Sequence, residues 1–164
     1  MSTRVLVSLA LSLTLFGCGQ DNDEPAPAAP AAAPPPAAPS APPAFVRKSV
    51  NDGARVYIVS PAYGAEAQSP VTVVFGLDGA GVAPAGIDLP NTGHHHLLVD
   101  TELANMGFPI PADGQHIHFG LGQTEASVEL APGAHTLRLV LGDTLHIPHD
   151  PPLVSPPVMI QVVE

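Results

Sequence analysis

The stretch His135-Thr136-Leu137-Arg138-Leu139-Val140-Leu141 decides the fold class of this 164-residue chain. Its leucines recur at every second position, so they share one face of an extended strand, whereas a helix needs a period of 3.6. The same period of two runs through Val71-Thr72-Val73-Val74-Phe75-Gly76-Leu77 and through Glu125-Ala126-Ser127-Val128-Glu129-Leu130. We therefore predict an all-β domain with a core of Val, Leu and Ile.

Turn residues separate these segments and set the number of strands. Pro and Gly, 21 and 15 in the chain, are too dense for long helices, and the one helical candidate is a turn near Thr101 to Met106. The segment from Leu130 to Leu137, with its turn on Pro132-Gly133, is typical of the corner between strands E and F of an immunoglobulin-like domain. The sequence predicts an all-β, immunoglobulin-like antiparallel β-sandwich of about seven strands. These strands are expected at 55–60, 71–77, 95–100, 116–119, 124–130, 135–142 and 157–163.

All histidines except His135 fall in three short clusters. The clusters read Gly93-His94-His95-His96, His116-Ile117-His118 and His146-Ile147-Pro148-His149. Imidazole is the side chain that proteins use most for transition metals. In the predicted sandwich the three clusters meet at one pole, because the loop before strand 95–100 and the loop before strand 157–163 share that end. His135 begins its strand at the opposite pole and is excluded.

Alternation along the strands selects the rings that can point the same way. If Leu97 and Val99 face the core, then His94 and His96 point outward, about 6.5–7 Å apart at Cβ. The same argument from Ile117 and Phe119 turns His116 and His118 outward, whereas His95 points inward and is interpreted as a core-edge residue. The candidate metal ligands are His94, His96, His116, His118, His146 and His149.

Each candidate ligand also has a simpler interpretation, because packing or a hydrogen bond could explain any single ring. His116 could be exposed, and His149 could cap the Asp150-Pro151 turn. Asp100 and Asp143 could ligate the ion or orient a ring, although Asp143 after Gly142 is better interpreted as a turn residue. Three consecutive polar residues could border a pocket, although solvent exposure explains them more simply. They are Gln123, Thr124 and Glu125.

The side chains available as ligands limit which metal ions the site could bind. The predicted domain has no cysteine, and imidazole-rich sites without a thiolate suit zinc or copper(II), and less often nickel or iron. The chain has no His-Glu-x-x-His, which argues against a zincin protease, and no Gly-x-Ser-x-Gly, which argues against a serine hydrolase.

The N-terminal region predicts export. Residues 1–17 are predicted to be a signal peptide, because one arginine, Arg4, is followed by an apolar run from Val5 to Phe16 that is too short to span a bilayer. The run ends in Gly17-Cys18-Gly19, which resembles a bacterial lipobox, and Cys18 is the only cysteine and the predicted lipidation site. Residues 18–44 follow as a Pro/Ala-rich disordered linker, and residues 45–164 form the His-rich domain.

Charge and targeting limit the partners. The chain has a net charge of −10, and its domain has four basic and twelve acidic residues, which argues against nucleic acid. We expect the protein on the periplasmic side of a bacterial membrane, with the outer membrane favoured, held there by the lipid alone. Its expected partners are a transition-metal ion and an envelope protein.

Four strings of the domain resemble a known family. They are Val82-Ala83-Pro84-Ala85-Gly86, the run from Asn91 to Asp100, the run from His118 to Glu125, and Leu141-Gly142-Asp143-x-x-His146-x-Pro148-His149. They are similar to the bacterial family of exported single domains named domain of unknown function 4399, with Leu121 in place of the usual Gly. The resemblance implies the domain boundaries and export, and it leaves the activity open. The family's motif residues fall on 93–96, His118, Gln123, Glu125, His146 and His149.

Three functions remain open at this point. The first is a lipid-anchored protein that binds copper or zinc for storage, delivery or buffering. The second is a structural or protein-interaction module in which the histidines hydrogen-bond to the backbone. The third is a copper metalloenzyme. Cu/Zn superoxide dismutase is also a β-sandwich with a His-x-His strand, but this chain lacks the disulfide that such enzymes usually have.

Overall fold

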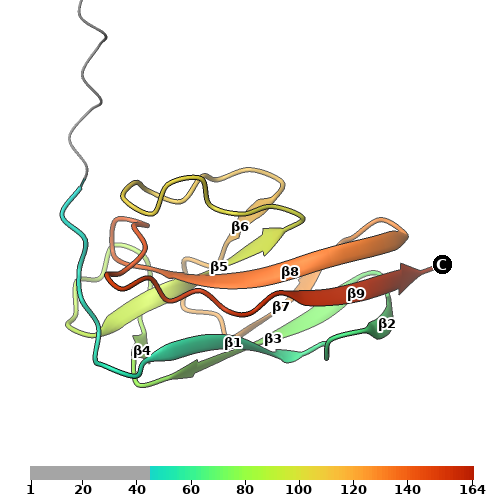
Figure 1. The fold of residues 1–164 in the computed structure, drawn as a ribbon, viewed down its shortest axis with the longest axis horizontal. Coiled ribbons are helices and arrows are strands. Elements are labelled where there is room, and N and C mark those ends of the chain that lie inside the picture. The colour runs from blue at the N-terminus through green and yellow to red at the C-terminus, as the bar shows by residue number, and fades with distance from the viewer. Residues whose placement is uncertain (1–44) are drawn as a thin grey trace, which may run out of the picture. The chain divides into compact units, whose positions relative to one another are not determined.

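The computed structural model describes residues 45–164, and these residues form an all-β domain (Figure 1). The predicted signal peptide, Cys18 and the Pro/Ala-rich linker lie outside the described residues. Within residues 45–164 there is no helix, and so none that could cross a membrane. The nine strands are β1 (Arg55–Ser60), β2 (Ala65–Gln68), β3 (Val71–Asp78), β4 (Gly81–Val82), β5 (Thr92–Val99), β6 (His116–His118), β7 (Glu125–Val128), β8 (Gly133–Gly142) and β9 (Val158–Val163).

The strands form two sheets. One sheet has the order β1-β3-β7, and the other has the order β2-β9-β8-β5-β4, with β6 also paired to β5. All seven expected strands are present, but β2 and β4 were not predicted, and the pairs β2–β9 and β4–β5 are parallel rather than antiparallel. The helical turn expected at Thr101–Met106 was wrong, because this segment is irregular.

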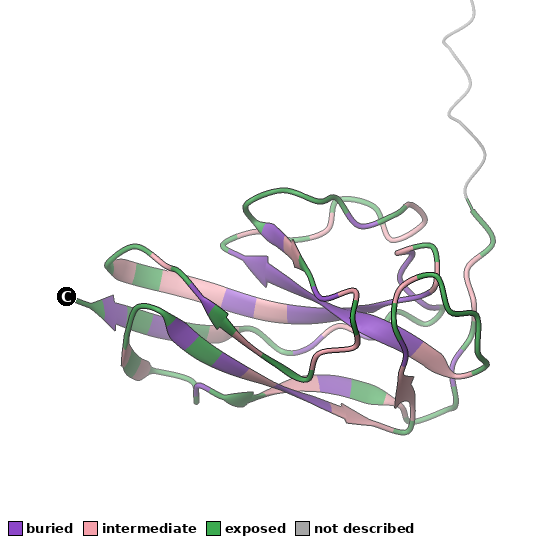
Figure 2. Ribbon diagram, turned by 180° about the vertical axis from the view of Figure 1, so that it is seen from behind, coloured by how far each residue is buried: buried purple, intermediate pink, exposed green. Residues whose placement is uncertain are grey.

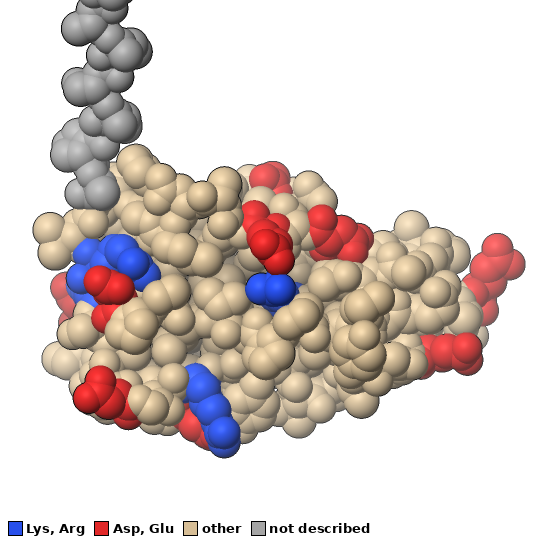
Figure 3. All heavy atoms as spheres, in the orientation of Figure 1, with Lys and Arg blue, Asp and Glu red and all other residues tan. Residues whose placement is uncertain are grey.

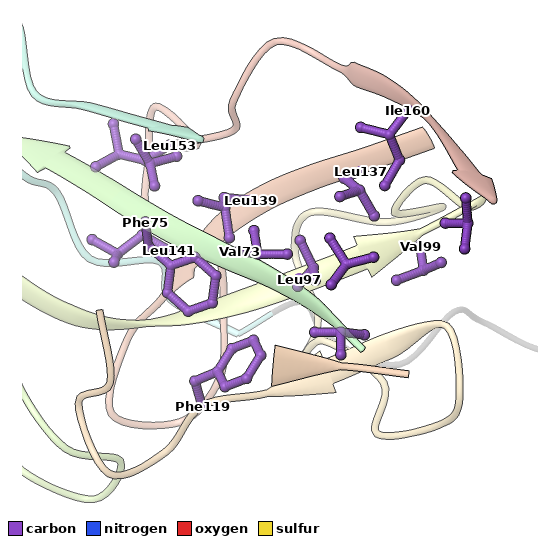
Figure 4. Close-up of a cluster of buried hydrophobic side chains, with 14 of the residues drawn as sticks. Val73, Phe75, Leu97, Val99, Phe119, Leu137, Leu139, Leu141, Leu153 and Ile160 are labelled. Atoms are coloured by element: carbon purple, nitrogen blue, oxygen red, sulfur yellow. The ribbon is translucent and has the colours of Figure 1, made fainter. Parts of the chain in front are cut away.

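The apolar faces of the two sheets meet in one core. Val73 and Phe75 of β3 contribute from one sheet, and Leu97 of β5 with Leu137 and Leu139 of β8 contribute from the other (Figure 4). Each of these side chains is 5% exposed or less. The residues come at every second position along each strand, as the sequence predicts, because alternate side chains of a strand share one face.

A second, smaller core covers the outer face of the larger sheet. Leu98 of β5 and Val140 of β8 point away from the main core and pack against Ile110, Leu103 and Val154. The segment between β5 and β6 carries two of these residues and crosses above β5 and β8 (Figure 1). Strand β5 is therefore buried on both faces for nearly its whole length (Figure 2).

The basic residues form ion pairs that connect segments of the domain. All four that lie in the described range pair with acidic side chains, and Figure 3 shows basic and acidic atoms side by side on the face it presents. Two of the pairs, Arg47 with Asp150 and Lys48 with Asp88, join the first described residues to loops near the start of β5 and the end of β8. The other two are Arg55–Asp78 and Arg138–Glu102.

Candidate metal centre

Four imidazole rings lie together on the outer side of β5. His94 and His96 come from β5, His118 from β6, and His146 from the loop after β8. The centroids of every pair of these rings lie 4.7 to 5.7 Å apart. We name these four residues the histidine cluster. Each of the three histidine-containing stretches of the sequence contributes at least one ring to it. The predicted convergence of these three stretches at one place is therefore confirmed.

The nitrogen atoms are close enough to share one ion. The Nε2 atoms of His94 and His96 are 3.0 Å apart. His94, His96 and His118 each offer a ring nitrogen, and these three atoms lie within 4.8 Å of one another. Two nitrogens bound to one zinc or copper ion at about 2.0–2.1 Å lie about 3.0–3.4 Å apart, so small side-chain rotations would bring the set into coordination range.

Strand register and two glycines make room for the rings. Alternation along β5 places His94 and His96 on one side, and the β5–β6 register sets His96 directly opposite His118. A Cβ atom on Gly142 would lie 2.9 Å from Nε2 of His96, and one on Gly120 would lie 2.3 Å from Cε1 of His118. The role of these glycines was not predicted from the sequence, although both stand within the family-like strings that carry the histidines.

A tight turn presents His146. Its backbone is left-handed, with φ at 67°, a conformation that residues other than glycine seldom adopt. The carboxylate of Asp143 stabilises the turn, because its Oδ1 accepts the N–H groups of Leu145 at 2.8 Å and Ile147 at 3.0 Å. The carbonyl of His146 also accepts the N–H of Ile110. Asp143 is therefore a turn residue, as the sequence indicates.

Three rings of the cluster are held in the neutral form near pH 7. Burial, followed by the neighbouring His146 and His118, lowers the pKa of His94 to about 4. Burial, followed by His94, lowers the pKa of His96 to about 2, and burial with His146 lowers the pKa of His118. A neutral imidazole keeps a lone pair on one ring nitrogen, which is the form that binds a metal ion.

Hydrogen bonds do not account for the cluster. The contact between His94 and His96 is the only hydrogen bond among the four rings in the described part of the chain. The Nδ1 atoms of both residues are buried without a partner there. Bringing neutral imidazoles out of water costs free energy, and the four rings, with no carboxylate or thiolate among them, form a donor set that could hold a transition-metal ion.

Two predicted ligands lie outside the histidine cluster. Nδ1 of His116 is 2.8 Å from Oδ1 of Asp113, and the ring lines a cavity of about 360 Å³ beneath the segment that joins β5 to β6. The register of β6 places His116 opposite Leu98, two residue pairs further from His94 than His118, which lies opposite His96. The ring of His149 is buried, with Nε2 3.2 Å from the carbonyl of Thr92. We therefore leave His116 and His149 out of the ligand set.

His95 points into the core, as the alternation of side chains along the strand predicts. Its ring packs against Phe75, with centroids 5.1 Å apart, and Nδ1 lies 3.1 Å from the carbonyl of Gln123. Burial lowers the pKa of His95, while the bond to Gln123 opposes this shift. The backbone of Gln123 thus orients a core residue, a role that was not predicted from the sequence.

His135 lies apart from the cluster and yields a prediction about stability. Nδ1 of His135 is 2.7 Å from Oδ2 of Asp100, and Nε2 is 2.8 Å from the carbonyl of Ala131, so the protonated ring can donate to both acceptors. Burial lowers the pKa of His135, but the bonds to Ala131 and Asp100 outweigh burial and raise it. A raised pKa stabilises the folded state below the unfolded pKa of about 6.5, and this contribution is lost as pH rises through the folded pKa.

We therefore expect the Asp100→Asn variant to lose stability near pH 6 and to lose much less near pH 9. Asparagine accepts the left-handed backbone of Asp100, with φ at 55°, so the change tests charge rather than strain. Urea unfolding of both proteins at the two pH values measures the difference. Equal destabilisation at both values would show that the ring is not protonated in the folded state.

Comparison with known proteins supplies the family. No curated protein and no solved structure is significantly similar to this chain. A family model matches residues 73–163, which are more than half of the chain and include the whole histidine cluster. The chain belongs to the family described as Domain of unknown function (DUF4399).

Proposed function

We propose that this protein is a lipid-anchored protein of the cell envelope that binds copper(II) or zinc through the histidine cluster. His94, His96 and His118 are the first three ligands, and His146 supplies the fourth. The observation that carries the proposal is the convergence of three neutral imidazoles, two of them buried, whose nitrogens lie within 4.8 Å of one another. Metal storage, delivery or buffering requires such a site and no further catalytic group.

The contrast with the other histidines supports metal binding over a purely structural role. His95, His135 and His149 each lie within hydrogen-bond distance of a backbone carbonyl, as a structural network requires. The four cluster rings have no such partner among the described residues and face one another instead. A structural role thus suits the first group, and ion binding suits the second.

The sequence supports the placement in the envelope. Cys18 follows an apolar run of the signal-peptide kind and is the residue that a lipobox would lipidate. Residues 25–44 contain only Pro, Ala and one Ser, and a chain of that composition would span roughly 60 Å as a tether at about 3.1 Å per residue. The metal site would then stand off the periplasmic face of the membrane, with the outer membrane favoured.

We also propose that the domain is an immunoglobulin-like sandwich. Strands β1, β3 and β7 correspond to A, B and E, and β9, β8, β5 and β6 correspond to G, F, C and C′, in the order that such domains have. The histidine cluster then occupies the end where the B–C and F–G loops meet.

Calorimetric titration with zinc and with copper(II) tests metal binding. We expect near-stoichiometric uptake by the protein, and loss of that uptake in the His94→Ala/His146→Ala double variant. The His116→Ala variant is the matched control, because its ring hydrogen-bonds to Asp113 and lies outside the cluster. Absence of binding above background for both metals would overturn the proposal.

A further inference from the structure

The histidine cluster has two sides that differ in accessibility. His94 and His96 are 0% and 1% exposed, and their strand β5 is paired with β8 on one edge and with β4 and β6 on the other. His118 is exposed and belongs to β6, which has three residues. His146 is half-buried in a loop. An ion in the cluster would thus have two fixed inner ligands and two outer ligands near solvent.

Resting on the proposed function, we infer that the cluster passes its ion directly to an acceptor ligand that enters beside His118 and His146. The acceptor is a molecule with nitrogen or thiolate donors, the ligand types that compete with imidazole for these metals. Its lone pair bonds to the ion as the lone pair of His118 leaves, then that of His146, and His94 and His96 release last. No electron is transferred, and the displaced imidazoles remain neutral or take a proton from water.

The order of displacement follows from how each ring is held. His94 and His96 lie in a central strand whose neighbours would have to separate before either ring could turn away. His118 makes no side-chain hydrogen bond within the described residues, is exposed, and packs against Gly120, which has no side chain to hold its ring in place. A free ion, by contrast, would have to break four bonds before leaving, which is the slower route when an incoming donor can replace one bond at a time.

Transfer of zinc to the chromophoric chelator 4-(2-pyridylazo)resorcinol tests the inference. Protein loaded with one equivalent of zinc is mixed with excess chelator, and the absorbance of the zinc–chelator complex is followed in time. We expect the transfer rate to rise in proportion to chelator concentration over at least a tenfold range. A rate independent of chelator concentration would show that the ion leaves unaided and would overturn the inference.

Two variants test the order of ligand loss. His118→Ala opens the outer side and is expected to speed transfer at least tenfold at equal chelator concentration, whereas His116→Ala on the same strand keeps the wild-type rate. Equal rates for His118→Ala and wild type would overturn the order. His118 is exposed, so its replacement leaves the core intact, and circular dichroism of both variants checks this. Failure of the wild-type protein to load either zinc or copper(II) would refute the proposed function itself, whereas zinc loading followed by chelator-independent release refutes only the transfer route.

Discussion

Replacing Gly93 with alanine is expected to destabilise the domain by about 3 kcal/mol, the upper end of the usual cost of overpacking a core. A Cβ atom there would lie 2.5 Å from the carbonyl oxygen of Gly142 and 2.9 Å from Cγ of Leu141. Both contacts come from β8, the neighbour of β5, so the new methyl group can be accepted only if the two central strands move apart. Because His94 follows Gly93 directly, the same movement would displace a ring of the histidine cluster. Urea or thermal unfolding of the metal-free protein measures the loss.

Gly114→Ala is the matched control for this prediction. Gly114 is exposed, and a Cβ atom there would meet nothing within 4 Å. The described structure also gives Gly114 no positive φ, so alanine is expected to change stability by no more than about 0.5 kcal/mol. If Gly93→Ala proved as mild as Gly114→Ala, the pairing of β5 with β8 beside the histidine cluster would have to be looser than described.

The metal-free protein is expected to lose at least about 3 kcal/mol of stability between pH 7 and pH 4 through the histidine cluster. The folded pKa of His94 is about 4 and that of His96 about 2, whereas an unfolded histidine has a pKa of about 6.5. Between these values the unfolded chain binds more protons than the folded one, so stability falls as pH falls below about 6.5. Each pH unit by which the folded pKa of a group lies below its unfolded pKa corresponds to about 1.4 kcal/mol of folding free energy lost on full protonation. The gap for His94 alone therefore accounts for the expected loss, and His96 adds to it.

Urea unfolding at a series of pH values, with metal removed by a chelator, measures this loss. The His96→Gln variant removes one titrating ring and should show a clearly smaller loss between pH 7 and pH 4. His116→Gln serves as the control, because His116 lies outside the cluster and its replacement should leave most of the pH dependence in place. An unchanged pH dependence in His96→Gln would argue that this ring is already hydrated in the folded protein.

The sequence predicted the class and the faces of the strands better than it predicted their ends and partners. The alternation in β3 and β8 is long and regular, and both strands lie where it placed them. Strands β2 and β4 were missed because four and two residues are too few to show a period. The second core around Leu98 was missed for another reason, since one apolar residue on an outward face gives no sign of what will cover it.

For the metal centre, parity along β5 and β6 correctly indicated that His94, His96 and His118 would share one side and that His95 would face the core. It could not separate His118 from His116, which have the same parity on the same short strand. Their difference comes from the register of β6 against β5, which sets His118 opposite His96 and His116 opposite Leu98.

The sequence by itself determined that the domain is built of strands, which side chains of each strand face inward, and that its histidines are concentrated in three places. These are local properties, since the side of a strand on which a residue lies depends only on its position in the chain. Only the tertiary structure decided which four of the six candidate rings meet. That choice depends on the register between β5 and β6, on the glycines that stand against the rings, and on the turn held by Asp143. Each of these is set by contacts that form only when the chain has folded.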